Sequence, residues 1–227
     1  MAKTIIINGF GTGISAAVAE RFGAEGFSLA LVARNAERLA AAAKALQAKG
    51  FRAEAFPADL GQIEATRSAI EQVRAALGPI TALHWNAYAG GAGDLTTAPP
   101  AELRTVYDVA VTSLVAAVQA ALPDLRAQRG AVLVTNGGLG LVDPKVDAMA
   151  VQWGTMGLAI ANAAKHKLVG VLAEKLRGDG VYVGQVVVTG TVKGTAWDNG
   201  NANLEAKTIA AKFWELFQQR TATSAIV

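Results

Sequence analysis

Cysteine is absent from this chain of 227 residues, and histidine occurs only twice. The lack of cysteine excludes disulfides, thiolate metal ligands and cysteine nucleophiles. His84 and His166 are too few for most histidine-based metal sites, so we expect no metal. There is no unbroken run of about 18 apolar residues and no apolar leader with a small-residue cleavage site. These absences predict a cytoplasmic protein with no membrane partner.

The chain also lacks a strong excess of charge of one sign. Lys and Arg number 21 against 18 Asp and Glu, which gives a net charge of +3, and the basic residues form no long run. A nucleic-acid groove needs clustered basic residues with interleaved aromatics, so we expect no nucleic-acid partner. Hydrophobic residues make up 52% and charged residues 17%, which is typical of a folded globular chain. The length suits one domain over 1–227.

What is present is an alternation of short β-branched runs with longer alanine-rich stretches. The runs predict strands at 4–8, 28–33, 52–58, 80–85, 131–135, 181–188 and, at the tail, 222–227. The stretches between them predict helices at 14–25, 36–49, 63–77, 101–128, 149–176 and 204–219. Apolar strands separated by helices indicate an α/β fold. With right-handed crossovers this is a Rossmann-type doubly wound parallel sheet of about seven strands, covered by helices on both faces.

A glycine-rich turn joins the first predicted strand to the first helix. Glycines let the backbone turn sharply and approach a pyrophosphate, and the helix N-terminus offers unpaired N–H groups. The turn therefore predicts a dinucleotide site, with a plain connecting loop as the alternative. Its predicted contacts are Gly9, Phe10, Gly11, Thr12, Gly13 and Ile14.

Residues that follow the second and third strands indicate which dinucleotide binds. An acidic residue at the end of the second strand would hold the ribose hydroxyls of NAD, but Ala33 stands there. Arg34 instead offers a planar cation to a 2′-phosphate, beside Asn35, so NADP(H) is favoured over NAD(H). Asp59 and Leu60 follow the third strand, where the carboxylate can accept from the adenine amino group or cap the next helix.

These features resemble the short-chain dehydrogenase/reductase family over essentially the whole chain. Gly9, Gly11 and Gly13 are similar to its N-terminal glycine motif, with Ser15 in place of the last glycine. Asp59-Leu60 resembles its adenine motif, and 83–90 is an altered form of its Asn-Asn-Ala-Gly stretch. The resemblance implies further cofactor contacts at Asn86, Ala87, Lys165, Thr189, Gly190 and Val192.

The resemblance ends at the family's Asn-Ser-Tyr-Lys set, in which tyrosine exchanges a proton and serine holds the carbonyl. The family asparagine corresponds to Ala110 and its serine to Gly137. If the lysine is Lys165, the tyrosine position holds Ala161; if it is Asn162, the tyrosine position holds Leu158. Neither alignment supplies a tyrosine.

Three residues are candidates for the chemistry that remains. Lys165 would contact the nicotinamide ribose, with a surface lysine as the alternative. Tyr88 follows the fourth strand and would be a replacement proton donor, or would pack on the cofactor. Asn136 would hold a substrate oxygen, or cap backbone groups. Trp153 is a candidate wall of a substrate pocket, and Trp197 a candidate lid residue.

The sequence therefore predicts an NADP(H)-dependent oxidoreductase with a non-standard active site. Its substrate is expected to be a small, moderately apolar carbonyl, imine or enone. The alternatives are a catalytically inactive dinucleotide-binding sensor or partner subunit, and a non-redox lyase or isomerase. The resemblance also implies a homodimer or homotetramer.

Overall fold

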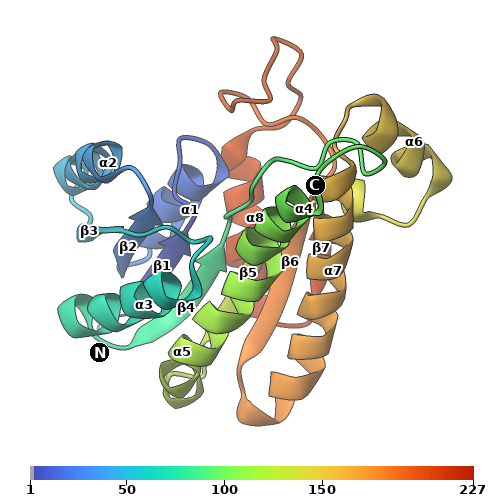
Figure 1. Cartoon of the computed structure of the whole chain (residues 1–227). Helices are drawn as coiled ribbons and strands as arrows, with labels where there is room; N and C mark the ends of the chain where they lie inside the picture. The colour runs from blue at the N-terminus through green and yellow to red at the C-terminus, as the bar shows by residue number, and fades with distance from the viewer. Residues whose placement is uncertain (1–2) are drawn as a thin grey trace.

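A single parallel sheet runs through the protein, in the computed structural model, which describes residues 3–227. Its strands are β1 (Lys3–Asn8), β2 (Phe27–Ala33), β3 (Ala53–Pro57), β4 (Ile80–Trp85), β5 (Ala131–Gly137), β6 (Tyr182–Val188) and β7 (Ser224–Ile226). Their order is β3-β2-β1-β4-β5-β6-β7, and all neighbours are parallel. The doubly wound seven-stranded sheet is confirmed. Strands β2 and β3 are added on one side of β1, and β4 to β7 are added on its other side (Figure 1).

Helices cover both faces of the sheet because neighbouring strand residues point to opposite sides. Ile5 and Ile7 face a core shared with α1 (Ile14–Gly23), α2 (Ala36–Ala48) and α8 (Ala206–Gln219). Ile6 faces a second core, shared with α3 (Ile63–Leu77), α5 (Ser113–Ala127) and α7 (Met156–Leu176). In Figure 1 the helices α3, α5 and α7 stand in front of the sheet, and α1 and α8 behind it.

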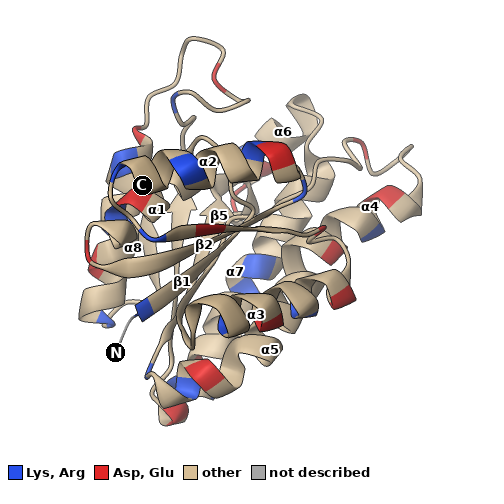
Figure 2. Cartoon of the chain, turned by 90° about the vertical axis from the view of Figure 1, so that its left-hand side faces the viewer, with Lys and Arg blue, Asp and Glu red and all other residues tan. Residues whose placement is uncertain are grey.

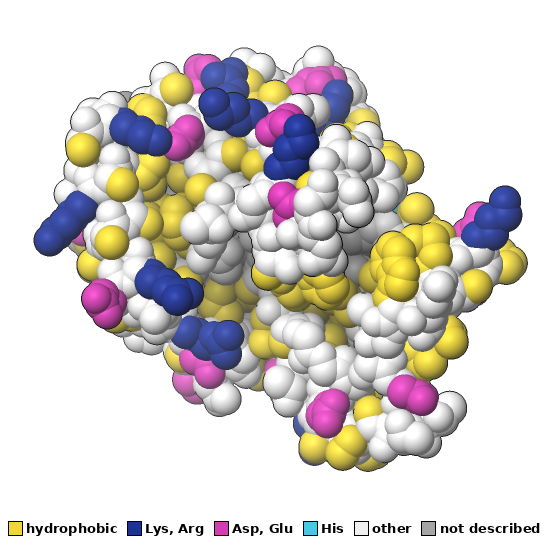
Figure 3. All heavy atoms as spheres, turned by 90° about the horizontal axis from the view of Figure 1, so that it is seen from above, with side chains coloured by type: hydrophobic (Ala, Val, Ile, Leu, Met, Phe, Trp, Pro, Cys, Tyr) yellow, Lys and Arg dark blue, Asp and Glu magenta, His cyan; other side chains and the backbone are white. Residues whose placement is uncertain are grey.

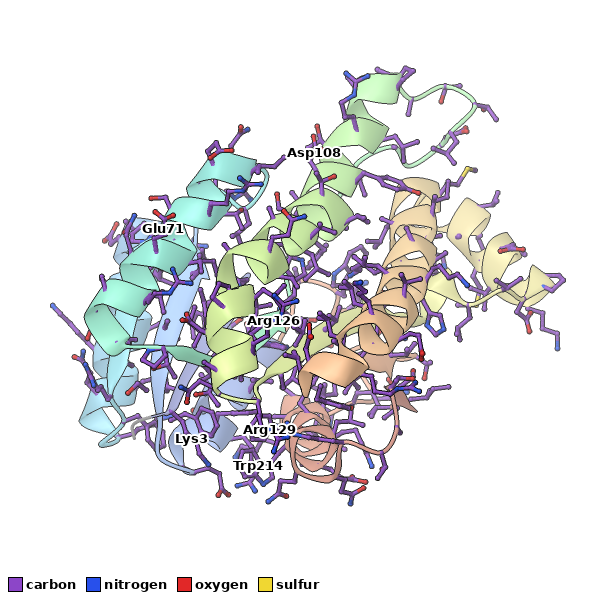
Figure 4. All side chains as sticks on the ribbon, turned by 90° about the horizontal axis from the view of Figure 1, so that it is seen from below. Lys3, Glu71, Asp108, Arg126, Arg129 and Trp214 are labelled. Carbon is purple, nitrogen blue, oxygen red and sulfur yellow. The ribbon has the colours of Figure 1, made fainter. Side chains whose placement is uncertain are left out.

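An aromatic cluster fastens α8 to the first layer. Phe22, Phe27, Trp214 and Phe217 have ring centroids 5.1–6.2 Å apart in six pairs, five of them edge-to-face and one stacked. Figure 4, which views the molecule from below, labels Trp214 of this cluster. Such pairs stabilise a fold beyond the burial of their area, so the cluster holds the amino half and the carboxyl half of the chain together away from the strand ends that carry function.

The predicted helix at 101–128 is a continuous rod with an irregular turn inside it. It consists of α4 (Pro100–Tyr107), a π-helical turn (Asp108–Thr112) and α5. The amide of Ser113 donates to the carbonyl of Asp108, five residues back. Figure 4 shows Asp108 and Arg126 well separated along this rod. The extra residue in the turn rotates α4 relative to α5, and π-turns of this kind are frequent at functional sites.

The predicted helix at 149–176 is wrong in its extent, because two helices occupy this region. A helix α6 (Pro144–Gln152) begins earlier, with Pro144 in its first turn and the Asp143 carboxylate accepting from the Lys145 amide. It ends before Gly154, whose φ of +59° breaks the helical path, and α7 follows. The helix predicted at 204–219 also begins later, because Leu204 forms a parallel bridge with Val192.

The long helix predicted at 101–128 has its expected length and is strongly apolar. The rod Pro100–Ala127 has 28 residues and a window of mean hydropathy 1.5, so by length and composition alone it could cross a membrane. In this fold Leu114, Ala117, Ala121 and Leu125 pack into the second core. One face of the rod therefore belongs to the core of the fold, as in the core helices of soluble proteins, which pass the same test of length and composition.

Charged side chains are distributed over the whole described surface. Figure 2 shows Lys and Arg intermixed with Asp and Glu, with both signs present on α2. Several form exposed pairs, such as Arg21 with Glu25 at 2.7 Å and Lys193 with Glu205 at 2.6 Å. Exposed pairs contribute little stability each, so the surface provides no concentrated field.

Candidate active site

A cavity of about 1170 Å³ opens at the carboxyl ends of the strands, beside the neighbouring strands β1 and β4, where the strand order reverses. This is where ligands bind in doubly wound sheets. Figure 3 looks down on this face and shows apolar side chains lining a hollow, with charged side chains around it. The cavity runs from the glycine-rich turn, past the ends of β4 and β5, to α6, and so joins the predicted dinucleotide site to a second chamber.

Nearly every predicted cofactor contact lines this cavity. The set comprises Gly9, Phe10, Gly11, Thr12, Gly13, Ile14, Arg34, Asp59, Leu60, Asn86, Ala87, Lys165, Thr189, Gly190 and Val192. Asn35 does not line the cavity. Its side chain instead caps α2 by accepting from the amide of Arg38 at 2.9 Å.

Gly9 makes the turn after β1 possible. Its φ is +80°, and a Cβ built there would lie 2.5 Å from the backbone nitrogen of Ala87. The side-chain amide of Asn86 donates back to the Gly9 carbonyl at 3.2 Å. The glycine therefore serves close packing of the first turn on the segment after β4, in addition to the approach to phosphate that the sequence suggested.

The start of α1 is suited to an anion. Its N-cap is Gly13, which offers no side-chain hydrogen bond to the first turn. The space around Gly11 is open, and the Ser15 hydroxyl accepts from the Gly11 amide at 2.8 Å, which holds the turn in shape. Free amides and the positive end of the helix dipole are what a pyrophosphate requires, so these residues fit a dinucleotide.

Arg34 and Asp59 lie at the adenosine end of the cavity. Arg34 is exposed at the end of β2, and no ion pair among residues 3–227 uses it. The Asp59 carboxylate accepts from the Gly61 amide at 3.0 Å in a tight turn. Gln62, and not Asp59, is the N-cap residue of α3.

Lys165 reaches from α7 to the floor of the cavity. Only 4% of the residue is exposed, and its ammonium donates to the carbonyl of Thr135 at 3.2 Å. No carboxylate among the described residues pairs with it. Burial disfavours the charged form and lowers the pKa of Lys165 to about 8. The surface alternative for this lysine is therefore wrong, because the side chain is buried in the pocket.

The positions of the family's asparagine and tyrosine are closed by small apolar side chains. Ala110, in the π-turn, packs with Val106 and Ala161, and all three are fully buried. Leu158, the tyrosine position in the other alignment, lines the cavity. Neither place offers a phenol, a carboxamide or a hydroxyl to a ligand.

Asn136 lies at the end of β5 with its side chain committed to other protein groups. Its amide donates to the Asn162 carbonyl and to the Gln185 side-chain oxygen, both at 3.0 Å. Its own oxygen accepts from the Gly137 amide at 3.0 Å. These contacts favour the alternative in which Asn136 caps neighbouring groups, and they fix the backbone of α7 against β5.

Asn162 is a site residue that sequence reasoning did not select for this role. It lies one helical turn before Lys165, is 4% exposed and lines the cavity. Its side-chain nitrogen is 2.6 Å from the point where a Cβ on Gly137 would stand. A Cβ on Gly140 would lie 2.5 Å from the Ala163 nitrogen. The two glycines therefore let α7 approach the turn after β5.

The second chamber of the cavity is apolar. The side chains that α6 and its flanking segments contribute are uncharged. Apart from Thr155, all of them are apolar, namely Leu139, Leu141, Val146, Met149, Trp153 and Leu158. Trp153 is 58% exposed, at the mouth. A chamber of this composition binds a ligand by burial of apolar surface and offers no ion pair to a carboxylate or phosphate.

The loop between β6 and α8 extends over the cavity. Its base is pinned where Asn203 accepts from the Thr191 amide at 3.0 Å and Lys193 pairs with Glu205. Thr195 lies against Gly13, and the Trp197 indole donates to the Tyr88 hydroxyl at 3.0 Å. In Figure 1 this loop rises above the sheet at the top of the molecule. Tyr88 and Trp197 therefore span the cavity mouth.

A buried histidine lies beneath the site. His84 of β4 is fully buried, packs edge-on against Phe213 with centroids 4.8 Å apart, and shares a hydrogen bond with the Thr135 hydroxyl at 3.0 Å. Burial lowers the pKa of His84 to about 3, so the ring is neutral. His166, in contrast, is exposed and accepts from or donates to Gln185 at 2.8 Å.

Comparison with known proteins agrees with this arrangement. The family model for short chain dehydrogenases matches residues 3–204, and the chain belongs to that family of oxidoreductases. No curated protein sequence matches the chain.

Solved structures extend the likeness to the whole fold. A metagenomic short-chain oxidoreductase in complex with NADP is 24% identical, with a TM-score of 0.83, over 99% of this chain and 96% of that one. L-Sorbose reductase from Gluconobacter frateurii, complexed with NADPH and L-sorbose, is 22% identical with a TM-score of 0.86, over 100% and 95%. A blue fluorescent protein from a metagenomic library, in complex with NADPH, is 25% identical with a TM-score of 0.85, over 99% and 96%.

Proposed function

We propose that the protein is an NADP(H)-dependent oxidoreductase that acts on a small, moderately apolar carbonyl, imine or enone. The observation that carries the proposal is the continuity of the cavity, which joins a turn built for pyrophosphate to an apolar chamber. A bound nicotinamide would supply or accept hydride. The chain's own groups would bind the dinucleotide, orient the substrate and exclude water.

Three features support NADP(H) over NAD(H). Arg34 is exposed at the end of β2 and faces the cavity, while Ala33 leaves no carboxylate for ribose hydroxyls. The metagenomic oxidoreductase, the sorbose reductase and the blue fluorescent protein are all described as complexes with NADP or NADPH. A guanidinium at this place suits a 2′-phosphate.

The proposed roles of the remaining residues follow from their positions. Lys165 holds the nicotinamide ribose from the cavity floor. Tyr88 supplies the proton, since its hydroxyl accepts from Trp197 and keeps its own hydrogen to donate. Asn136 keeps α7 in place. A cytoplasmic homodimer or homotetramer completes the proposal, supported by the exposed Ile160 and Val171 on α7.

A second candidate is a catalytically inactive dinucleotide-binding protein, favoured by the apolar closure at Val106, Ala110 and Ala161. Calorimetry with NADP and NAD, followed by NADPH oxidation against panels of ketones, aldehydes, imines and enones, separates the two. The proposed enzyme binds NADP more tightly than NAD and turns over at least one panel member. Tight binding with complete silence would establish the second candidate, and no binding of either nucleotide would refute both.

A further inference from the structure

The Asn162 amide is the one side-chain group at the cavity wall that is buried, polar and outside every hydrogen bond of residues 3–227. Only 4% of the residue is exposed, and its backbone carbonyl, but not its side chain, accepts from Asn136. The side chain borders the cavity, so a polar ligand atom there can accept a hydrogen bond from its amide.

The surroundings of Asn162 fix where this amide points. Its nitrogen occupies the space above Gly137, at 2.6 Å from the position of an absent Cβ. Gly140 allows the backbone of α7 to pack on the same turn. Asn136 holds the Asn162 carbonyl from β5 at 3.0 Å. The backbone of Asn162 is therefore held against the turn after β5, and its side-chain nitrogen lies beside Gly137.

We infer that the Asn162 amide is the group that holds the reacting oxygen of the substrate. This inference rests on the proposed carbonyl chemistry and adds a residue to it. When hydride reaches the carbonyl carbon, the π electron pair moves to oxygen, which becomes negative before it takes a proton. The Asn162 N–H donates a hydrogen bond to that oxygen and keeps its own hydrogen, as an oxyanion-hole donor does.

In this arrangement the hydrogen-bond donor comes from α7 and not from the turn after β5. The family places its carbonyl-holding hydroxyl on the turn after β5, which corresponds here to Gly137. This chain removes the side chain from the turn and brings a donor to the same space from α7. Lys165, three residues later on the same face of α7, adds a positive charge to the cavity floor.

A vibrational measurement tests the inference without turnover. Acetophenone with a ¹³C-labelled carbonyl is bound to the protein loaded with NADP⁺, which holds no hydride to transfer. The carbonyl stretch of the bound ketone is expected below its frequency in hexane. Asn162→Leu removes most of this shift, and Gly170→Ala, at an exposed site on α7 with open space around it, retains it.

Kinetics gives a second readout on any ketone that is reduced. Asn162→Leu is expected to lower kcat and kcat/KM together by about 100-fold, because the bond strengthens in the transition state. Gly137→Ala, whose methyl displaces the amide, should cause a similar loss. The double variant should lose little more than either single one, since both remove the same contact.

Several outcomes would overturn the inference. They are an equal carbonyl frequency in the wild type and in Asn162→Leu, a wild-type band at the hexane position, and no saturable binding of the ketone. If the variant fails to fold, the position of the carbonyl band in the wild type decides the test by itself. A shift that Asn162→Leu abolishes, together with no reduction of any panel compound, would support the donor and refute the proposed oxidoreductase activity.

Discussion

The two ends of the cavity differ in how far they depart from the family. At the dinucleotide end, Gly9, Gly13 and Asp59 keep the family's residue types, and their geometry explains each one. At the reaction end, the expected counterparts of the family's asparagine, serine and tyrosine are Ala110, Gly137 and either Ala161 or Leu158, while polar side chains enter from α7. The first end must fit one fixed ligand, whereas the second must fit whichever substrate the protein uses. Function therefore diverges there while the fold is kept.

The largest effect should come from the dinucleotide end, with Gly9→Ala. The new Cβ would meet the Ala87 backbone at 2.5 Å, in a residue whose φ is +80°. We expect the free energy of unfolding to fall by about 3–5 kcal/mol, as for strain combined with overpacking. Chemical denaturation measures it.

Gly26→Ala is the matched control, because Gly26 has φ +82° with open space around it. It should cost only about 1–2 kcal/mol of strain. Equal losses at the two positions would mean that the contact between the first turn and the segment after β4 is unimportant.

Next in size is Lys165→Met at the reaction end, measured on the protein without nucleotide. Between pH 8 and 10.5 the native state binds fewer protons than the unfolded chain, so its stability rises with pH in that window. Below pH 8 the cost of a buried charge is complete. At pH 7 the free energy of unfolding of the variant should therefore be about 2 kcal/mol higher than that of the wild type, after the lost hydrogen bond is subtracted.

The difference should shrink as pH rises through 8 toward 10.5. Thermal unfolding of both proteins across pH 6–10.5 checks it. If the difference in unfolding free energy stayed constant over that range, Lys165 would not be a buried charged group with a lowered pKa.

Arg34→Ala should have a smaller effect, confined to one nucleotide. Loss of a charged hydrogen bond at an exposed site should weaken NADP binding about 10-fold and leave NAD unchanged. Arg38→Ala, on the exposed surface of α2 and outside the cavity, is the control. Equal weakening of both nucleotides would contradict a 2′-phosphate contact.

The smallest effect concerns the hydrogen bond between Trp197 and Tyr88 at the mouth of the cavity. Trp197→Phe removes the indole donor to Tyr88 and keeps an aromatic ring. A neutral hydrogen bond on a half-exposed pair contributes about 0.5–1 kcal/mol, so NADPH should dissociate two- to fivefold faster. Stopped-flow fluorescence measures the rate. Tyr88→Phe should match it without adding to it, and additive effects would refute a direct latch.

The sequence predicts the sheet well because apolar strands give a strong and local signal. Five of the seven strands lie within one residue of their predicted limits at each end. The exceptions are β5, which continues to Gly137, and β7, which begins only at Ser224. The helices were harder. A π-turn leaves no clear sequence signal, so the rod at 100–127 was expected to be regular. The break after α6 has one in Gly154, which follows Trp153 at a helix end.

The candidate site divides in the same way. Residues of the glycine turn could be found because they are adjacent in sequence and their chemistry is fixed by the phosphate. Asn162 could not, because its proposed role depends on α7 lying close to a turn 25 residues earlier. The clue was available in Gly137 and Gly140, since paired glycines after a strand are typical of close backbone approach.

The contact between Gly137 and Asn162 also constrains how this protein could have arisen. A side chain at 137 and the amide at 162 compete for one volume, and the amide, as the far end of a side chain, is the group that shifts. A side chain added at 137 alone would therefore displace the proposed donor, and replacing Asn162 alone would leave no donor beside Gly137. Such epistasis predicts that relatives carry these two positions as a linked pair, and that reverse engineering must change both at once.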